Sequence, residues 1–309
     1  MVSSEIGATL AGAAGGPVSA ATRRTEVLVN GVRTTLLLAG SQDDDVAVVF
    51  VHGSSGMGRD WTPLLEAVSE SARCIAPDMP GYGASDKPAD FSYTVEGYAR
   101  HLDRLLGIIG VRRVHLVTHD LGGPWGLAWA ASRPQDLLSL TLVSIGALPG
   151  YRWHRFARLY RLPMIGELVL ATAGRLATAR ALQRGSLRPV PEWFVDEIVA
   201  EYRDPGTRRA VLAFYRATPD LGAATVASAA ALRRADPPTL VIWGAGDPYV
   251  PVRYAELQHQ FFPRAEVVVF PDSGHWPLVD DPEAVTGAVV VFLKGLLTSR
   301  ISEPGEELP

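Results

Sequence analysis

The hydrophobic and polar positions of the chain follow two alternating patterns. Short apolar runs rich in Val, Ile and Leu predict buried strands, and amphipathic stretches with helical spacing separate them. The expected strands cover residues 25–30, 32–39, 46–51, 74–76, 114–117, 138–145, 239–243 and 266–270. The expected helices between and after them cover residues 60–71, 94–109, 125–131, 252–262 and 282–297. This alternation predicts an α/β fold with a mostly parallel, eight-stranded sheet flanked by helices on both faces.

The pattern changes between the sixth and seventh expected strands. Residues 147–232 contain no strand pattern, only helical pieces rich in arginine and aromatic residues and interrupted by prolines. An all-helical insertion at this point predicts a cap over the carboxyl edge of the sheet, where sites of parallel sheets lie. The expected organisation is a disordered arm (1–22), a core in two segments (23–146 and 233–298), the helical cap (147–232) and a polar tail (299–309).

Composition narrows the class of partner. The 309 residues are 47% hydrophobic and 20% charged with a net charge of -4, which gives no electrostatic footprint for nucleic acid or an anionic membrane. The single cysteine, Cys74, excludes a disulfide framework. We find neither a secretory signal nor a membrane-spanning apolar run, so we expect a cytoplasmic protein that binds a small hydrophobic substrate. A homodimer is compatible with the sequence, which does not specify the oligomeric state.

The most informative stretch is VHLVTHDLGG, residues 114–123, where an apolar strand stops at a polar residue and two glycines follow. A strand, a tight glycine-bounded turn and then a helix form a nucleophile elbow, a strained turn that lifts one side chain above the sheet edge. Serine is the usual residue at the centre of this turn, but here Asp120 occupies it. An aspartate is already ionised at neutral pH, so it can attack a carbon without first losing a proton to a base.

Two later strands also end in polar residues. The strand TLVIWG is followed by Asp247, and the strand VVVF is followed by His275. The order nucleophile, acid, histidine is that of the α/β-hydrolase fold. In this arrangement His275, oriented by Asp247, would activate a water molecule that attacks an ester formed on Asp120.

Five segments together resemble the successive motifs of the α/β-hydrolase superfamily. They are VFVHGSSG, APDMPGYGASDKP, VTHDLGGP, VIWGAGDPYVP and DSGHWPLVDDP, spread over residues 48–282. The His-Asp-x-Gly-Gly elbow further resembles the branch with an aspartate nucleophile, which contains epoxide hydrolases and dehalogenases. The resemblance implies a covalent alkyl-enzyme ester on Asp120 and no cofactor, and no residue spacing suggests a metal site.

The ester mechanism needs donors for negatively charged oxygens. Backbone amides of Ser54 and Leu121 are the expected oxyanion hole. The stretch Phe214-Tyr215-Arg216 resembles the cap motif in which epoxide hydrolases place a ring-opening tyrosine, so Tyr215 is the expected proton donor to an epoxide oxygen. The other expected pocket residues are Trp125, Tyr151, Trp153, Tyr160 and Trp276, with Tyr151 and Tyr160 as candidates for a second ring-opening tyrosine.

Two departures from the resembled families bear on the substrate. Leu121 stands where haloalkane dehalogenases usually carry a halide-binding tryptophan, and Ser54-Ser55 replaces the usual pair that ends in proline. The first departure favours an epoxide hydrolase over a haloalkane or haloacid dehalogenase. Alternatives stay open: Asp120, Asp247 and His275 are also ordinary turn or loop residues, and the fold also serves non-hydrolytic pathway enzymes and small-molecule receptors.

Overall fold

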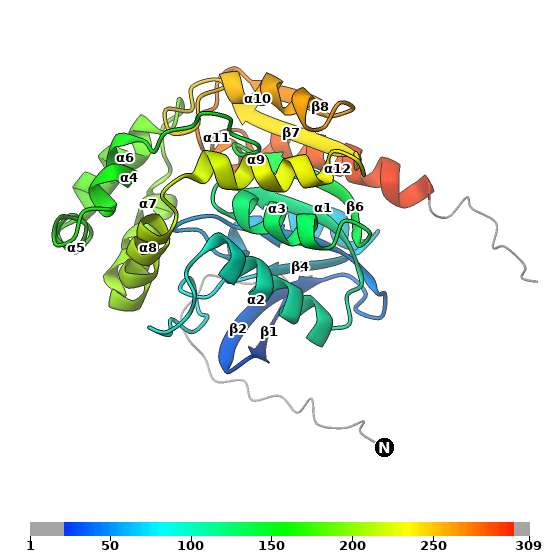
Figure 1. The fold of residues 1–309 in the computed structure, drawn as a ribbon, viewed down its shortest axis with the longest axis horizontal. Helices are drawn as coiled ribbons and strands as arrows, with labels where there is room; N and C mark the ends of the chain where they lie inside the picture. Colours follow the sequence, from blue (N-terminus) through cyan, green and yellow to red (C-terminus); the bar gives the residue numbers. More distant parts are fainter. Residues whose placement is uncertain (1–21, 300–309) are drawn as a thin grey trace, which may run out of the picture.

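A single sheet organises residues 22–299, the part of the chain that the computed structural model describes (Figure 1). Its eight strands follow the order β1-β2-β4-β3-β5-β6-β7-β8. Only β2 runs antiparallel to its neighbours β1 and β4; all other neighbouring strands are parallel. The strands are β1 (Thr22–Val29), β2 (Val32–Ala39), β3 (Val46–Val51), β4 (Arg73–Pro77), β5 (Arg113–His119), β6 (Leu137–Val143), β7 (Thr239–Gly244) and β8 (Glu266–Phe270). The α/β-hydrolase architecture expected from the sequence is thereby confirmed for the sheet.

Local chemistry explains how the sheet begins. Asn30 and Gly31 join β1 to β2 with φ angles of 50° and 83°, the left-handed values that a two-residue hairpin turn requires. The six residues of β3 are all buried, as expected for a strand covered on both faces. The expected N-terminal arm and C-terminal tail lie outside the described residues, apart from residues 22 and 299.

Helices cover both faces of the sheet. One face carries α1 (Thr62–Ser69) and α12 (Pro282–Ser299), which pack on each other over the side chains of β3 and β7. The opposite face carries α2 (Val95–Ile108), α3 (Gly122–Ser132), α9 (Leu221–Leu232) and α10 (Arg253–Leu257). Three short helices, η1 (Gly58–Trp61), η2 (Gln258–Gln260) and α11 (Pro277–Asp280), lie in the connections.

Five helices between β6 and α9 gather at one side of the molecule (Figure 1). We call them the inserted helices: α4 (Arg155–Tyr160), α5 (Ile165–Ala171), α6 (Arg175–Arg184), α7 (Glu192–Arg203) and α8 (Pro205–Ala217). Helix α9 differs from them, because it packs along α3 over the sheet. The division of the chain into a core and a cap at residues 147–232 stays a prediction.

Candidate active site

The elbow forms where β5 ends. Asp120 follows the strand with a φ of 47°, a left-handed conformation that aspartate tolerates better than most residues. The next turn needs glycine, because a Cβ on Gly122 would lie 2.2 Å from the carbonyl oxygen of Val51. The chain can therefore turn sharply into α3 and leave the Asp120 side chain at the carboxyl edge of the sheet.

Two backbone amides hold the Asp120 carboxylate. Ser54 N donates to Oδ1 over 2.9 Å, and the amide of Leu121 is a second donor to this carboxylate. Its other oxygen, Oδ2, lies 3.5 Å from Nε2 of His275. Burial raises the pKa of Asp120, but the hydrogen bond and positive charge of His275 outweigh burial and hold it below its usual range. The carboxylate is therefore ionised at neutral pH.

The histidine is oriented from its opposite side. Nδ1 of His275 bonds Oδ2 of Asp247 over 2.7 Å, and Oδ1 of Asp247 accepts from the amides of Tyr249 and Val250 over 2.8 and 2.9 Å. Burial lowers the pKa of His275, but the negative charges of Asp247 and Asp120 raise it above its usual value. The backbone amide of His275 also donates to the carbonyl of Gly185, just after α6, over 2.6 Å.

Two further histidines border this constellation in structural positions. Nε2 of His52 accepts from the amide of Met79 over 2.9 Å, and Nε2 of His119 donates to the carbonyl of His275 over 2.9 Å. Burial lowers the pKa of both imidazoles, to about 4 for His119. Both rings are therefore neutral and hold the loops on which Asp120 and His275 depend.

The expected cap tyrosines fall into different environments. Tyr215, on α8, is buried, and burial together with the nearby charge of Asp120 raises its pKa. Its ring packs on Trp153 and Tyr160 with centroids 4.9 and 5.4 Å apart. The hydroxyl of Tyr151 instead donates to the carbonyl of Tyr249 over 3.2 Å. The charge of Asp120 thus acts on Tyr151 and Tyr215, whereas Tyr160 packs behind Tyr215.

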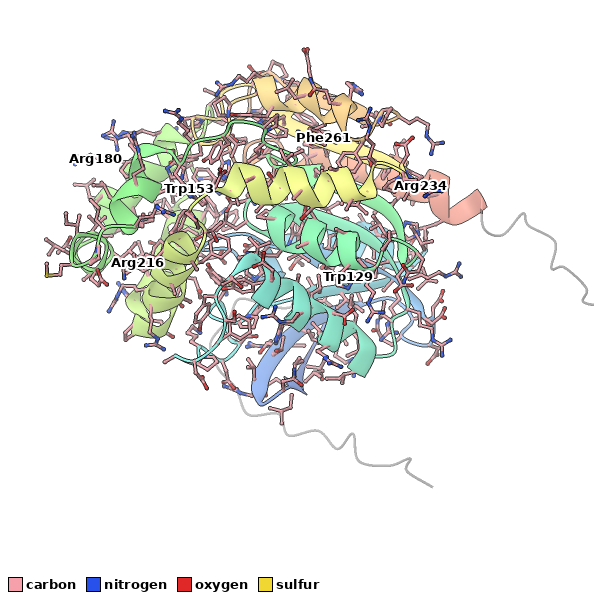
Figure 2. All side chains as sticks on the ribbon, in the orientation of Figure 1. Trp129, Trp153, Arg180, Arg216, Arg234 and Phe261 are labelled. Carbon is pink, nitrogen blue, oxygen red and sulfur yellow. The ribbon has the colours of Figure 1, made fainter. Side chains whose placement is uncertain are left out.

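The tryptophans differ in whether the indole N–H is engaged: that of Trp153 has a partner, and that of Trp125 has none within residues 22–299. The indole N–H of Trp153 donates to the carbonyl of Thr218 over 2.8 Å, near the junction of the inserted helices with α9 (Figure 2). Trp125 is fully buried and stacks on Tyr98 with centroids 4.0 Å apart. Trp193 is 57% exposed. Trp276, by contrast, packs against the His275 ring with centroids 5.1 Å apart.

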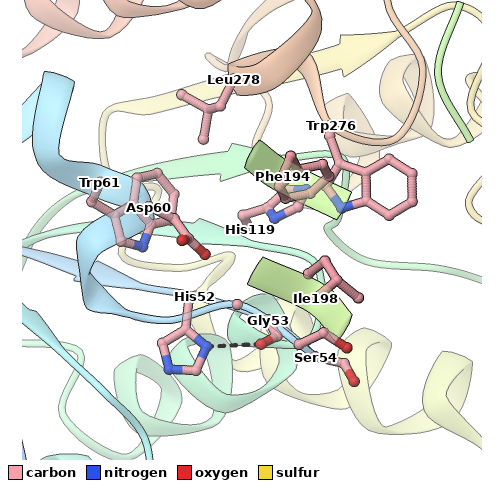
Figure 3. Close-up of a pocket in the computed structure, with 12 residues that line it drawn as sticks. His52, Gly53, Ser54, Asp60, Trp61, His119, Phe194, Ile198, Trp276 and Leu278 are labelled. Atoms are coloured by element: carbon pink, nitrogen blue, oxygen red, sulfur yellow. Dashed lines mark hydrogen bonds between the residues drawn. The ribbon is translucent and has the colours of Figure 1, made fainter. Parts of the chain in front are cut away.

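A small cavity of about 40 Å³ lies behind the loop 52–56 and has room for water molecules (Figure 3). Phe194 and Ile198 of α7 face this loop across the cavity, and Trp276 borders it. Asp60 also lines the cavity, and burial raises its pKa to about 8, against the opposing effect of the Met57 amide. Helix α7 therefore covers the loop that carries the Ser54 amide.

Two tyrosines next to the site escaped the sequence analysis. The phenol oxygen of Tyr202, on α7, accepts a hydrogen bond from the Ser55 hydroxyl, and the buried phenol of Tyr82 has no hydrogen-bond partner within residues 22–299. Burial raises the pKa of each phenol, and the charge of Asp120 adds to this effect. The one signal in the sequence is the unusual Ser54-Ser55 pair, because Ser55 is the residue that Tyr202 contacts.

Some apolar residues of the inserted helices do not contribute to the site. Met164 and Leu168 at α5 are 82% and 64% exposed, so their apolar character says nothing about the substrate. Within residues 22–299 no cluster of three or more His, Cys, Asp or Glu side chains is arranged to hold a metal ion. Over the same residues, no helix combines the length and apolar character needed to cross a membrane.

The site and the sheet together define the class of protein. Residues 46–282 match the family model of the alpha/beta hydrolase fold, so the chain belongs to this family and is an enzyme of the hydrolase type. Its relatives include the cis-3-alkyl-4-alkyloxetan-2-one decarboxylase of Xanthomonas campestris, 31% identical, with 85% of this chain and 93% of that protein covered.

Dehalogenases are similar in both sequence and fold. The haloalkane dehalogenase of Mesorhizobium japonicum is 30% identical, with 75% of this chain and 78% of that protein covered. The crystal structure of the haloalkane dehalogenase DbeA from Bradyrhizobium elkani superposes with a TM-score of 0.79 at 25% identity and covers 90% of this chain and 99% of that chain. The chain is therefore an α/β hydrolase with dehalogenase-like relatives.

Proposed function

We propose that the protein is an epoxide hydrolase that works through a covalent alkyl ester on Asp120. The observation that carries this proposal is the ionised Asp120 carboxylate, held by the Ser54 and Leu121 amides beside His275. Asp120 attacks one ring carbon of the epoxide, a C–O bond of the ring breaks, and Tyr215 donates a proton to the departing oxygen.

Hydrolysis of the ester then regenerates the enzyme. His275, oriented by Asp247, removes a proton from a water molecule, whose oxygen attacks the ester carbonyl carbon. The amides of Ser54 and Leu121 stabilise the resulting oxyanion. Collapse of this intermediate releases the diol, with a proton returned from His275 to the leaving alcohol oxygen. The carboxylic acid left on Asp120 gives its proton to the Tyr215 phenolate, so every atom and charge is restored.

The donors at the site support an oxygen leaving group over a halide. Alkoxide needs a proton, and Tyr215 provides a hydroxyl on the side of the inserted helices. A halide needs N–H donors. Leu121 has no side-chain donor and the indole of Trp153 is engaged by Thr218, so among the described residues the buried indole of Trp125 is an unengaged donor that a halide could use. The relative named as an oxetanone decarboxylase acts on another strained oxygen ring, which is consistent with this preference.

Dehalogenation by the same ester mechanism is the second candidate. It is favoured by the relatives named as haloalkane dehalogenases. The two reactions differ only in the leaving group, so one experiment separates them from each other and from a non-hydrolytic or receptor function.

The experiment traps the ester. His275→Ala cannot activate water, so turnover should fall by about 10²–10⁴-fold while Asp120 still reacts. We would incubate this variant with a panel of epoxides, haloalkanes and an oxetanone and measure intact mass, with peptide mapping to locate the adduct. The matched control is His275→Ala combined with Asp120→Asn, which should gain no mass.

The adduct identifies the substrate class. An epoxide adds its full mass to Asp120, whereas a haloalkane adds its mass less the hydrogen halide. If the variant gains no mass from any compound and the wild type converts none of them, the proposed ester mechanism is wrong.

A further inference from the structure

The inserted helices present an apolar surface to solvent at the outer edge of the molecule, around α5 (Figure 1). Six large apolar side chains are exposed there, although residues of this type are usually buried. We call them the exposed apolar patch: Leu159, Leu162, Met164, Ile165, Leu168 and Leu176. They lie on α4, on α5, at the start of α6 and in the turn between α4 and α5, two helices that pack on each other. A group of this size on a protein surface is typical of contact with a partner.

Met164 lies in the turn at the centre of the patch. Its backbone has a φ of 65°, in the left-handed region that residues other than glycine rarely adopt. Its side chain is nevertheless 82% exposed, so the strained turn brings no burial for this methionine. Leu168 follows one turn later on α5, where its amide donates to the carbonyl of Met164 over 3.0 Å, and it is exposed as well. Packing within the described residues therefore does not explain these two apolar side chains.

Positive charge is concentrated around the patch. Residues 152–188 contain eight arginines and one glutamate, a net charge of +7 in a chain whose total is -4. The glutamate, Glu167, is paired with Arg216 of α8 over 2.7 Å. Five of the arginines are exposed and form neither an ion pair nor a side-chain hydrogen bond within residues 22–299: Arg152, Arg155, Arg158, Arg180 and Arg184. The total charge, which argues against an anionic membrane for the chain as a whole, averages over this surface.

Arginine and apolar side chains share the exposed helix faces. On α4, Arg155, Arg158 and Leu159 occupy positions i, i+3 and i+4, which lie on one face of a helix. On α6, Leu176 and Arg180 are four residues apart and share a face in the same way. Arg180 projects from the outer side of the inserted helices (Figure 2). Each face thus combines apolar groups with cations on long, flexible side chains.

We propose that the inserted helices dock on an anionic lipid membrane through the exposed apolar patch and the five unpaired arginines. Guanidinium groups bind lipid phosphates, and the apolar side chains enter the layer between the headgroups and the acyl chains. This docking goes beyond the proposed hydrolysis and does not depend on the ester mechanism.

Other partners fit this surface less well. A symmetric contact with a second copy would place arginine against arginine, and the one carboxylate of residues 152–188 is already paired. Nucleic acids stack their bases on aromatic rings, whereas the patch consists of Leu, Ile and Met side chains. An anionic membrane matches both the charge and the apolar groups.

Vesicle binding tests the proposal. We would mix the full-length chain with vesicles of phosphatidylcholine and phosphatidylglycerol in equal parts, or of phosphatidylcholine alone, and measure the bound protein by flotation. The mixed vesicles should bind at least about tenfold more tightly, because only they carry negative charge. Salt at about 0.5 M should remove most of this difference, because it screens exposed charges.

Two double variants separate the charged and apolar parts of the surface. Arg155→Gln with Arg158→Gln should weaken binding to the mixed vesicles by about 25-fold, because each arginine near an anionic surface contributes about fivefold. Met164→Gln with Leu168→Gln should weaken it by about tenfold or more, through the loss of apolar burial. All four side chains are exposed, so both variants should keep the melting temperature of the wild type.

Matched controls make the same kinds of change elsewhere. Arg233→Gln with Arg234→Gln removes two exposed arginines at the end of α9, on the opposite side of the molecule from Arg180 (Figure 2). Val291→Gln removes an exposed apolar side chain of α12. Both controls should bind the mixed vesicles as tightly as the wild type.

Each result decides the proposal. Salt-sensitive binding to the mixed vesicles that both patch variants weaken and both controls keep supports it. The proposal is overturned if the wild type does not bind, if the patch variants bind unchanged, or if the controls lose as much. Sedimentation velocity without vesicles tests the other occupant: a dimer that Met164→Gln with Leu168→Gln dissociates would assign the patch to a second copy and also overturn the proposal. None of these measurements needs turnover, so failure of the ester mechanism would leave them unaffected.

Discussion

The edge of the sheet and the inserted helices contribute to the site in different ways. At the sheet edge, the three polar residues Asp120, Asp247 and His275 come from the loops after β5, β7 and β8. Each is held by backbone or carboxylate partners at 2.7 to 3.5 Å. On the inserted helices, Tyr202 and Tyr215 are held mainly by packing and by contacts with distant loops. In the proposed mechanism, the sheet edge provides the nucleophile and the base, and Tyr215 on the inserted helices provides the proton for the leaving group.

The two regions should differ in how strongly a substitution depends on the leaving group of the substrate. Changes at the sheet edge should affect every substrate, because attack needs the Asp120 carboxylate and hydrolysis of the ester needs His275, whatever the leaving group. Changes on the inserted helices should depend on the leaving group. Substitutions in the two regions, measured with substrates that differ in their leaving group, can therefore test this distinction.

The largest effect is expected for Asp247→Asn. The amide can no longer stabilise the protonated ring of His275, so hydrolysis of the ester should fall by roughly 10³-fold or more. Ester formation should change far less, because Asp120 keeps its own partners. Rapid-quench measurement of the two steps checks this. An equal loss in both steps would contradict the prediction that Asp247 acts mainly in hydrolysis of the ester.

A smaller and more selective effect is expected for Tyr215→Phe. Turnover of epoxides should fall by about 100-fold, whereas displacement of bromide should keep its rate. Steady-state rates with both substrate types provide the measurement. An unchanged epoxide rate would remove Tyr215 from ring opening.

The smallest effect concerns stability where the two regions meet, at Asp60. Burial raises the pKa of this carboxyl from its ordinary value of 3.8 to about 8 in the folded protein, so the unfolded chain releases the proton first as pH rises. Stability is therefore lost as pH rises from about 4 to about 8. Asp60→Asn should remove this loss, which is about 1.4 kcal/mol for each unit of pH in this range. The substitution should therefore raise the melting temperature by a few degrees more at pH 9 than at pH 5.

The control for this measurement is the exposed residue Asp90. Asp90→Asn should shift the melting temperature equally at both pH values. The charged neighbours of Asp60 are Glu197, Asp78 and Arg59. If Asp60→Asn shifts the melting temperature equally at pH 5 and pH 9, Asp60 does not carry a neutral carboxyl in the folded protein.

Sequence reasoning reached the sheet edge because local rules govern it. Apolar runs define the strands, parallel strands bring their carboxyl ends to one edge, and the Asp-x-Gly-Gly turn needs only local backbone geometry. The positions of Asp120, Asp247 and His275 relative to one another follow from these rules. Their catalytic roles stay predictions until the ester is trapped.

The inserted helices could not be predicted to the same depth. Helical periodicity on α7 identifies an apolar face, whose buried residues are Phe194, Val195, Ile198 and Val199. It does not predict which residue Tyr202, one turn further along the helix, will contact. Tyr202 meets Ser55 only through the docking of the whole helix on the loop. The hydrogen bond from the Trp153 indole to the carbonyl of Thr218 could not be predicted for the same reason, because it joins residues that are 65 positions apart in the sequence.

The bond from the His275 amide to the carbonyl of Gly185 ties the proposed base to the end of α6. A movement of the inserted helices large enough to admit a substrate would stretch this bond and shift the imidazole away from Asp120. His275 would then be unable to activate water while the site is open for a substrate to enter. The ester on Asp120 would then be hydrolysed only while this bond is intact. One backbone contact would thereby set the order of hydrolysis and opening.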